Sequence, residues 1–214
     1  MLIKKKVKEI EYEFHKWKKP LLIIDSIFSI IVIVLIGLIR PDYIIIATYF
    51  LIILYLIISE RKKFFYHFLI ASLIAIIWMI IAKNEYGYNQ DYLTIYGFNT
   101  FPLFSWAIGL FAIYVLYSHI EHIFIEKGFI KKLILFSILF IPILIFVETL
   151  GYYVFDIHNI ATDNFKGLPI CNCIHAPWWM QLSYILLGPI FFSICYLLKL
   201  ENPHYKTKKF KNRH

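Results

Sequence analysis

Six long apolar runs decide what this chain can fold into. Within each run, isoleucine, leucine and phenylalanine follow one another without the spacing that would leave one side of a helix or strand for water. About 20 such residues cross a hydrocarbon core of roughly 30 Å, and backbone groups inside lipid need partners within their own segment, which favours helices. The sequence predicts membrane-spanning helices, the fifth broken by Pro142, at 21–39, 43–59, 64–82, 101–118, 133–150 and 178–198.

The composition supports a single membrane domain. Apolar residues make up 60% of the chain, above the roughly 45–50% of a soluble domain, and no connecting segment is long enough to build its own core. The first run lacks a small-residue cleavage site, so we expect it to be retained as a helix. The predicted fold is an all-α integral membrane protein, a six-transmembrane-helix bundle at 21–198 between a basic N-terminus (1–20) and a basic tail (199–214).

Charge predicts the orientation of the bundle. Basic residues exceed acidic ones in four segments that the spans place on one side, namely 1–20, 60–63, 119–132 and 199–214. The segments on the other side are neutral or acidic, and positively charged flanks stay in the cytoplasm. We therefore expect a multi-pass protein of the cell membrane with both termini cytoplasmic and the 151–177 loop outside. The basic tails are expected to contact anionic lipid headgroups, whereas nucleic acid is not an expected partner.

The segment from 148 to 179 gathers acids, histidines, cysteines and asparagines more densely than any other connection. Glu148 lies near the outer end of the fifth run, where an ionised and unpaired carboxylate costs a few kcal/mol. It is therefore expected to be neutral or partnered, and a neutral acid can protonate a hydrophobic substrate. The alternative is an interface residue that hydrogen-bonds a neighbouring helix or a loop amide.

Asp156, His158 and Asn159 follow in the same segment. If the fifth helix continues past Gly151, Asp156 lies two turns beyond Glu148 and both face one cavity. An acid and a histidine two residues apart can form a proton relay. The alternative, which is favoured, is a solvated loop with a helix cap.

Cys171, Cys173 and His175 are residue types that bind zinc or copper. Their spacing is shorter than the usual zinc spacing, and His158 is the only obvious further ligand. Three cysteines give little indication of a disulfide framework. Packed or weakly reactive thiols are therefore favoured over a metal centre.

A second polar cluster lies between the fourth and fifth runs and consists of His119, Glu121, His122 and Glu126. On a helix, His119, His122 and Glu126 share a face. A di-metal centre needs further carboxylates on facing helices, and Glu60 and His67 are the only near candidates. An interfacial helix end is therefore favoured over a metal site.

Two other features are interpreted as structural. Asp25, about one turn inside the first run, is expected to reach water or a lysine near the membrane boundary. Aromatic residues toward the outer ends of the runs are expected to form a belt at the membrane interface. They are Trp78, Tyr86, Tyr88, Tyr92, Tyr96, Trp106, Trp178 and Trp179.

Two stretches carry a resemblance to a known family. In the first, residues 95–106 (IYGFNTFPLFSW) open the fourth run, and Tyr114 follows. This stretch resembles a Gly-x-Pro…Pro-Leu-x-Trp run of the carotenoid-biosynthesis integral membrane proteins, which include the bisanhydrobacterioruberin hydratases. Asn99 stands at the position of the first proline.

The second stretch combines residues 148–156 with residues 167–172. It resembles the acidic segment of the same family, with Glu148 in place of an aspartate, and a later Gly-Val-Pro…Asn-x-x-Gly-Trp run, with Trp178 near the expected tryptophan. The resemblance implies water addition to a polyisoprenoid double bond, or its proton-driven rearrangement. It also implies that Glu148 is the acid and that Asp156, Asn159, Asn172 or His175 orients the water.

These observations predict a membrane enzyme, a hydratase or isomerase of a membrane-dissolved isoprenoid lipid, that requires no cofactor and no metal. The expected catalytic residues are Glu148, Asp156, His158 and Asn159. The expected substrate-binding residues are Asn99, Trp106, Asn172, His175 and Trp178. Two alternatives stay open: a non-catalytic membrane protein that binds a lipid or partner helices, and a metal- or redox-linked membrane protein that uses the two cysteines. The oligomeric state is open too, and a homo-oligomer is compatible with the sequence.

Overall fold

The computed structural model describes residues 13–14, 18–59, 61–121, 128–160, 164–200 and 202–206. Within these residues, six helices are long and apolar enough to cross a membrane. They are α2 (Lys18–Leu38), α3 (Pro41–Ile58), α4 (Phe64–Ala82), α5 (Thr100–Ile120), α6 (Phe129–Tyr153) and α7 (Trp178–Leu197). The predicted helical class and the six predicted spans are confirmed. Most of the two basic tails lies outside the described residues, so their contact with lipid headgroups stays a prediction.

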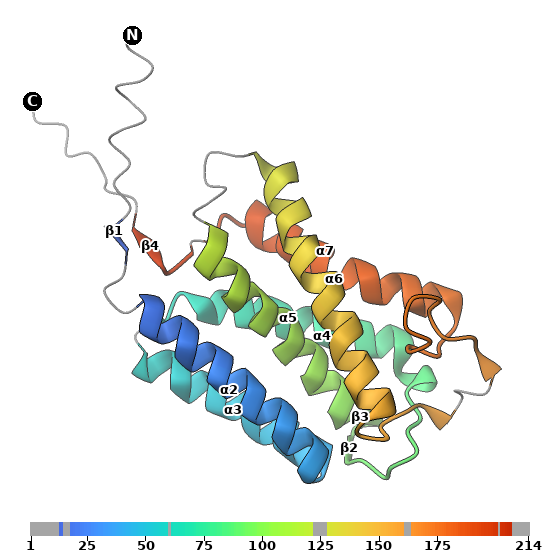
Figure 1. The fold of residues 1–214 in the computed structure, drawn as a ribbon. Helices are drawn as coiled ribbons and strands as arrows, with labels where there is room; N and C mark the ends of the chain where they lie inside the picture. The colour runs from blue at the N-terminus through green and yellow to red at the C-terminus, as the bar shows by residue number, and fades with distance from the viewer. Residues whose placement is uncertain are drawn as a thin grey trace, which may run out of the picture.

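Helix α5 is the central helix of the bundle. It packs against α2, α3, α4, α6 and α7, and its buried side chains lie all round it between Thr100 and His119. Helices α2 and α6 instead bury few of their residues and turn many apolar side chains outward, as expected for helices that face lipid. Figure 1 shows α5 between α2 and α6. The polar groups of α5 are therefore the ones best placed to face an internal site.

Prolines lie in the first turn of three helices, α2, α3 and α5, and inside two others, α6 and α7. Pro41 occupies the first turn of α3, where its missing N–H costs nothing. The prediction that Pro142 breaks the fifth span is wrong, because α6 continues through it to Tyr153. Spanning helices tolerate an internal proline when neighbouring groups satisfy the freed backbone carbonyl. Glu148 therefore lies within α6, in the last two turns before its end.

The two ends of the bundle are different in construction. At one end, here called the terminal end, β1 (Glu13–Phe14) pairs antiparallel with β4 (Tyr205–Lys206), which are the first and the last described segments. At the opposite end, the loop end, lie the 3-10 helix η1 (Lys83–Glu85), the hairpin of β2 (Thr94–Ile95) and β3 (Phe98–Asn99), and residues 154–177. Figure 1 shows the two short sheets at opposite ends of the helices.

An ion pair between an exposed Arg40 and a buried Asp42 ties the α2–α3 turn to the loop end. The Asp42 carboxylate accepts hydrogen bonds from Arg40 Nε (2.9 Å) and from the backbone N–H of Leu93 (2.8 Å). Arg40 also donates from Nη2 to the carbonyl oxygen of Asp91 (2.5 Å). Asp42 is fully buried, and a buried carboxylate needs such a set of donors. This pair fixes the position of the segment that leads into the hairpin.

Candidate functional site

An elongated apolar cavity runs through the bundle and is the candidate site. Its volume is ≈ 490 Å³, within the range of roughly 300–1,000 Å³ typical of ligand pockets. Residues of α5 from Phe101 to Leu116 line it, a distance of about 22 Å at about 1.5 Å per residue. The other walls come from α2, α3 and α6. Because α2 and α6 pack on α5 but make almost no contact with each other, the cavity lies over α5 and between these two helices.

Glu148 lies at the loop end of the cavity. It is half-buried, and its neighbours in the cavity wall include the three tyrosines Tyr86, Tyr88 and Tyr184. Among the residues that the structure describes, the Glu148 carboxyl makes no hydrogen bond and no ion pair. Burial raises the pKa of Tyr86 and of Tyr88 above the ordinary phenol value, so both keep their protons. The carboxyl therefore faces an apolar space that contains neutral hydroxyl groups.

A buried network of aromatic side chains supports this end of the cavity. The indole N–H groups of Trp78 and Trp106 both donate to the Tyr86 hydroxyl oxygen, at 2.7 and 2.8 Å. The Tyr184 hydroxyl oxygen lies 2.8 Å from the same atom. An indole only donates, and a phenol oxygen has two lone pairs. Both lone pairs of Tyr86 are therefore taken, and its own O–H must donate to Tyr184.

The Tyr184 hydroxyl is available to donate a hydrogen bond to a molecule in the cavity. Since the Tyr184 oxygen accepts from Tyr86, its own O–H is directed to another acceptor. No second acceptor for it exists among the described protein groups, and the side chain lines the cavity together with Glu148. The site thus combines a carboxyl and a hydroxyl donor at one end of an apolar space.

The aromatic-belt interpretation holds for only part of the predicted set. Trp178 and Tyr96 are 77% and 96% exposed at the loop end, as a belt requires. It is wrong for Trp78, Tyr86 and Trp106, which are buried and hydrogen-bonded in the core. The sequence held no signal for this network, because its members come from α4, α5, α7 and the segment after α4.

The terminal end of the cavity holds a second polar group, centred on Asp25. Its Oδ1 accepts from the Tyr55 hydroxyl (2.6 Å) and from Arg61 Nη2 (2.8 Å). Its Oδ2 accepts from Arg61 Nη1 (2.8 Å), and His119 Nε2 lies 2.9 Å away, where it must be the donor to a carboxylate. The expectation that Asp25 reaches water or a lysine is therefore corrected. Its partners are a buried arginine and a histidine that lies 94 residues further along the chain.

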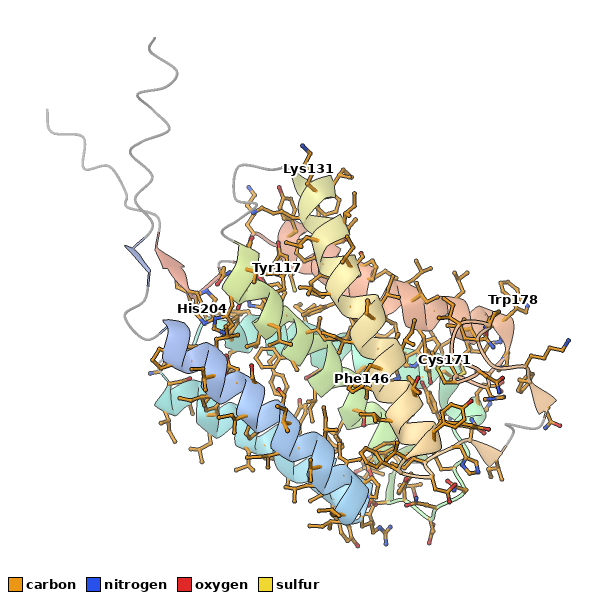
Figure 2. All side chains as sticks on the ribbon, in the orientation of Figure 1. Tyr117, Lys131, Phe146, Cys171, Trp178 and His204 are labelled. Atoms are coloured by element: carbon orange, nitrogen blue, oxygen red, sulfur yellow. A yellow bond between two sulfur atoms is a disulfide. The ribbon has the colours of Figure 1, made fainter. Side chains whose placement is uncertain are left out.

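The start of the C-terminal segment packs into the same end. His204 is buried, with Nδ1 3.1 Å from Ser118 Oγ and its ring centre 4.1 Å from that of His119. Asn202 Nδ2 donates to the Ser118 carbonyl and to Glu121 Oε2, both at 2.8 Å. Residues 202–204 are thus part of the bundle. Figure 2 shows His204 at the terminal end, far from Trp178 and Cys171.

The structure does not bring the second polar cluster together as a metal site. His119 bonds Asp25, while Glu121 forms an ion pair with Lys132 (3.0 Å). His67, considered as a further ligand, stacks on Tyr114 in the core. His122, Glu126 and Glu60 lie outside the described residues. Within the described part of the chain, no three His, Cys, Asp or Glu side chains are arranged to hold a metal ion.

Asp156 and His158 lie outside the cavity. Helix α6 ends at Tyr153, so the continued helix that would align Asp156 with Glu148 does not form. The Asp156 side chain is 83% exposed and pairs with His158 Nδ1 at 3.3 Å. Asn159 donates to the carbonyl oxygen of Glu85 and so joins two segments of the loop end. These three residues are placed to stabilise the loop, and the structure separates them from Glu148.

The cysteine segment is also structural. Cys171 and Cys173 form a disulfide, which overturns both the free-thiol and the metal-thiolate interpretations because neither sulfur is a thiolate. His175 lies 2.9 Å from the carbonyl oxygens of Phe165 and Asn172 through its two ring nitrogens. The Asn172 and Trp178 side chains are exposed. None of these residues lines the cavity.

Two of the nine predicted site residues, Glu148 and Trp106, meet in the cavity wall. Asn99 instead caps α5, because its side-chain oxygen accepts from the N–H of Phe101 (3.0 Å). The prediction missed Tyr184 and Arg61. Arg61 lies within the basic turn at 60–63, a pattern typical of a membrane boundary, and Tyr184 lies in an apolar run in which a tyrosine is ordinary.

The fold and the cavity define a class: a multi-pass helical membrane protein with an internal apolar site that is polar at both ends. Comparison with known proteins gives no match, whether to a family model, to a curated protein or to a solved structure. The chemistry of the cavity therefore has to indicate the function.

Proposed function

We propose that this protein is an integral membrane enzyme that protonates a double bond of an isoprenoid lipid dissolved in the membrane, with Glu148 as the acid. One observation carries the proposal: an acidic side chain without a partner among the described residues lies at the end of a long apolar cavity. An apolar environment favours the uncharged form of a carboxyl group. A carboxylic acid in contact with an apolar chain is what alkene protonation requires.

The proposed reaction begins with transfer of the Glu148 proton to one alkene carbon. A new C–H bond forms from the two π electrons, and the other alkene carbon becomes a cation. Aromatic rings of Tyr88, Phe101 and Trp106 lie in the cavity wall, and the faces of such rings stabilise a cation by roughly 0.5–2 kcal/mol each. The apolar walls also keep bulk water away from the cation.

The cation can react further in two ways, and each returns a proton to Glu148. If a neighbouring carbon returns a proton to the Glu148 carboxylate, the double bond moves and the lipid is isomerised. If a water molecule adds its oxygen to the cation and gives a proton to the carboxylate, the lipid becomes an alcohol. Tyr184 supports the second outcome, because its O–H can hold the oxygen of a water molecule beside Glu148. Either way Glu148 is restored, and no cofactor enters the balance.

The isoprenoid class comes from the resemblance to the carotenoid-biosynthesis membrane proteins, and the shape of the cavity supports it. A chain of isoprene units is long, apolar and unsaturated, which fits a narrow cavity about 22 Å long. The proposal assigns no chemical role to Asp156, His158, Asn159, Asn172 or His175, because none of them lines the cavity.

The proposed location is the cell membrane, with the terminal end in the cytoplasm. Support comes from the lysine-rich segments on that side of the six spans. In this orientation Glu148 lies toward the outer leaflet and Asp25 toward the cytoplasm.

The decisive experiment compares lipid extracts of cells that produce the wild-type protein or the Glu148→Gln variant. Glutamine keeps the shape of the side chain and removes the transferable proton. The variant should lose the lipid product and accumulate its unsaturated precursor. Glu85→Gln is the matched control, since it makes the same chemical change in η1, outside the cavity. Identical lipid profiles for Glu148→Gln and wild type, at equal protein levels, would show that Glu148 is not the acid.

A second candidate is a protein that binds a lipid in the same cavity without changing it. The polar group around Asp25 favours neither candidate, but the size and apolar lining of the cavity suit both. Lipid that copurifies with the protein, together with unchanged lipid profiles, would support this candidate over the enzyme.

A further inference from the structure

At the terminal end of the cavity, the guanidinium group of Arg61 has N–H groups that the described residues do not use. The Arg61 guanidinium carries five N–H groups. Nε donates to Ser59 Oγ (3.2 Å), and one N–H each of Nη1 and Nη2 donates to Asp25 (2.8 Å). Two N–H groups remain without an acceptor among the described residues. Arg61 is 3% exposed and lines the cavity.

Asp25 cannot serve as the acceptor for further donors or as a ligand for a bound molecule. Its two oxygens accept from Tyr55, from His119 and twice from Arg61, and a carboxylate has about four acceptor positions. Asp25 therefore holds Arg61 in place. The rings of Tyr55 and Phe64 lie 4.9 and 5.5 Å from the guanidinium carbon and fix its plane.

The charge at this end selects the kind of group that can bind. Among the residues that line the cavity, Asp25 and Arg61 are the charged ones at the terminal end, and they form a bidentate pair without net charge. A phosphate or carboxylate would bring an uncompensated negative charge into a buried site, which costs several kcal/mol. A hydroxyl or carbonyl oxygen accepts the two N–H groups without that cost.

We propose that the cavity binds one linear lipid chain whose uncharged oxygen terminus, a hydroxyl or carbonyl, accepts hydrogen bonds from Arg61. The far part of the chain then lies at Glu148. A zigzag chain with bonds of ~1.5 Å advances roughly 1.25 Å per carbon, so about 17 chain carbons fill the ~22 Å between the ends. Binding of the lipid at Arg61 does not depend on the proposed reaction, whereas the position of the reacting double bond rests on the proposed function. With Glu148 as the acid, the reacting double bond lies far from the oxygen terminus.

The route of entry follows from the same geometry. Helices α2 and α6 form opposite walls with almost no contact between them, and both turn apolar side chains outward. A lipid can therefore enter sideways from the membrane without crossing a polar surface. At the loop end, the ring of Phe155 lies against Gly37 and lines the cavity, which limits the length of the bound chain.

The test is a competition assay on the full-length protein in detergent micelles. Deuterated 1-hexadecanol is bound first, and native mass spectrometry follows its displacement by 1-hexadecanol, heptadecane or hexadecyl phosphate at equal mole fraction in the micelle. We expect the alcohol to compete at least tenfold better than the alkane and the phosphate. Equal competition by the alkane would overturn the polar site, and better competition by the phosphate would overturn the uncharged terminus.

Two variants locate the site. Arg61→Lys should reduce the preference for the alcohol over the alkane to less than threefold, because lysine lacks the spare donors of the guanidinium. Arg40→Lys is the matched control: Arg40 forms a similar pair with Asp42 but does not line the cavity. A preference that survives in Arg61→Lys would overturn the assignment to Arg61. If Arg61→Lys does not fold, the order in which the alcohol, the alkane and the phosphate compete for the wild-type protein decides whether the proposed site exists.

Glu148→Gln separates this inference from the proposed function. Binding of 1-hexadecanol should change less than threefold in this variant, since the oxygen terminus lies at the other end of the cavity. A selective alcohol site with an unchanged cellular lipid profile would refute the enzyme and leave the binding site standing. A changed lipid profile without alcohol selectivity would refute the binding site at Arg61 and leave the proposed enzyme standing.

Discussion

Gly109→Leu is the most direct test of the cavity. Gly109 lies on α5 in the cavity wall, and a Cβ atom added there meets no other atom within 4 Å. The leucine side chain therefore extends into the empty space without displacing protein atoms. Gly109 is about 12 Å along α5 from Phe101 and about 10 Å from Leu116, so the new side chain divides the cavity near its middle.

The size of the expected loss of binding follows from packing, because the hydrophobic effect is about the same for the bound and the excluded lipid chain. A chain excluded from the cavity stays in lipid or detergent, which is as apolar as the cavity wall. What remains is the strain of fitting a chain beside a side chain that fills its path, typically about 1–3 kcal/mol. At ~1.4 kcal/mol per factor of ten, we expect binding of 1-hexadecanol to weaken by about 5- to 150-fold.

The same variant should fold at least as well as the wild type. Replacing a helical glycine by leucine favours the helix by up to about 1 kcal/mol, and no clash opposes it. The melting temperature, measured by light scattering in detergent, should therefore not fall. Gly128→Leu is the control, since Gly128 also has open space around an added Cβ but lies outside the cavity wall. Undiminished 1-hexadecanol binding in Gly109→Leu would refute the cavity as the lipid site.

Three further predictions test the ends of the cavity. Phe155→Ala should open the loop end, so that 1-docosanol competes better relative to 1-hexadecanol than it does with the wild type; an unchanged ranking would contradict a role in chain length. Tyr184→Phe leaves the buried Tyr86 O–H without its acceptor, and the unfolding free energy should fall by about 1–3 kcal/mol, while hydrated product decreases in lipid extracts. A product level equal to that of the wild type would remove Tyr184 from the reaction. Asp25→Asn leaves Arg61 as a buried unpaired charge, and we expect a loss of about 3–5 kcal/mol in unfolding measurements; a melting temperature equal to the wild type would show that the pair is not needed for stability.

The disulfide and the loop show where local patterns misled. Cys171, Cys173 and His175 have side chains that suit a metal, but only their spatial arrangement decides between a metal site, free thiols and a disulfide. In the structure, the two sulfurs bond each other and His175 lies between carbonyl oxygens. Asp156 shares the cavity with Glu148 only on a continued helix, and α6 ends three residues before it.

Glu148 shows what local patterns can find. An acid in an apolar run stands out because its burial has a large energetic cost, and this signal needs no knowledge of the partners. The same reasoning singled out Asp25 but could not name Arg61 and His119 as its partners, which lie 36 and 94 residues away in the sequence. Tyr184 gave no signal, since a tyrosine near the end of an apolar run is ordinary.

The sequence by itself determined the six spans, because each helix satisfies its own backbone and the lipid sets its length and apolarity. Those constraints are local, so they can be read from consecutive residues. The tertiary structure alone decided which polar side chains meet: Tyr86 with Tyr184, 98 residues apart, and Asp25 with Arg61 at the other end of one cavity. Helix packing sets these contacts, and nearly uniform apolar faces leave that packing without a strong signature in the order of the residues.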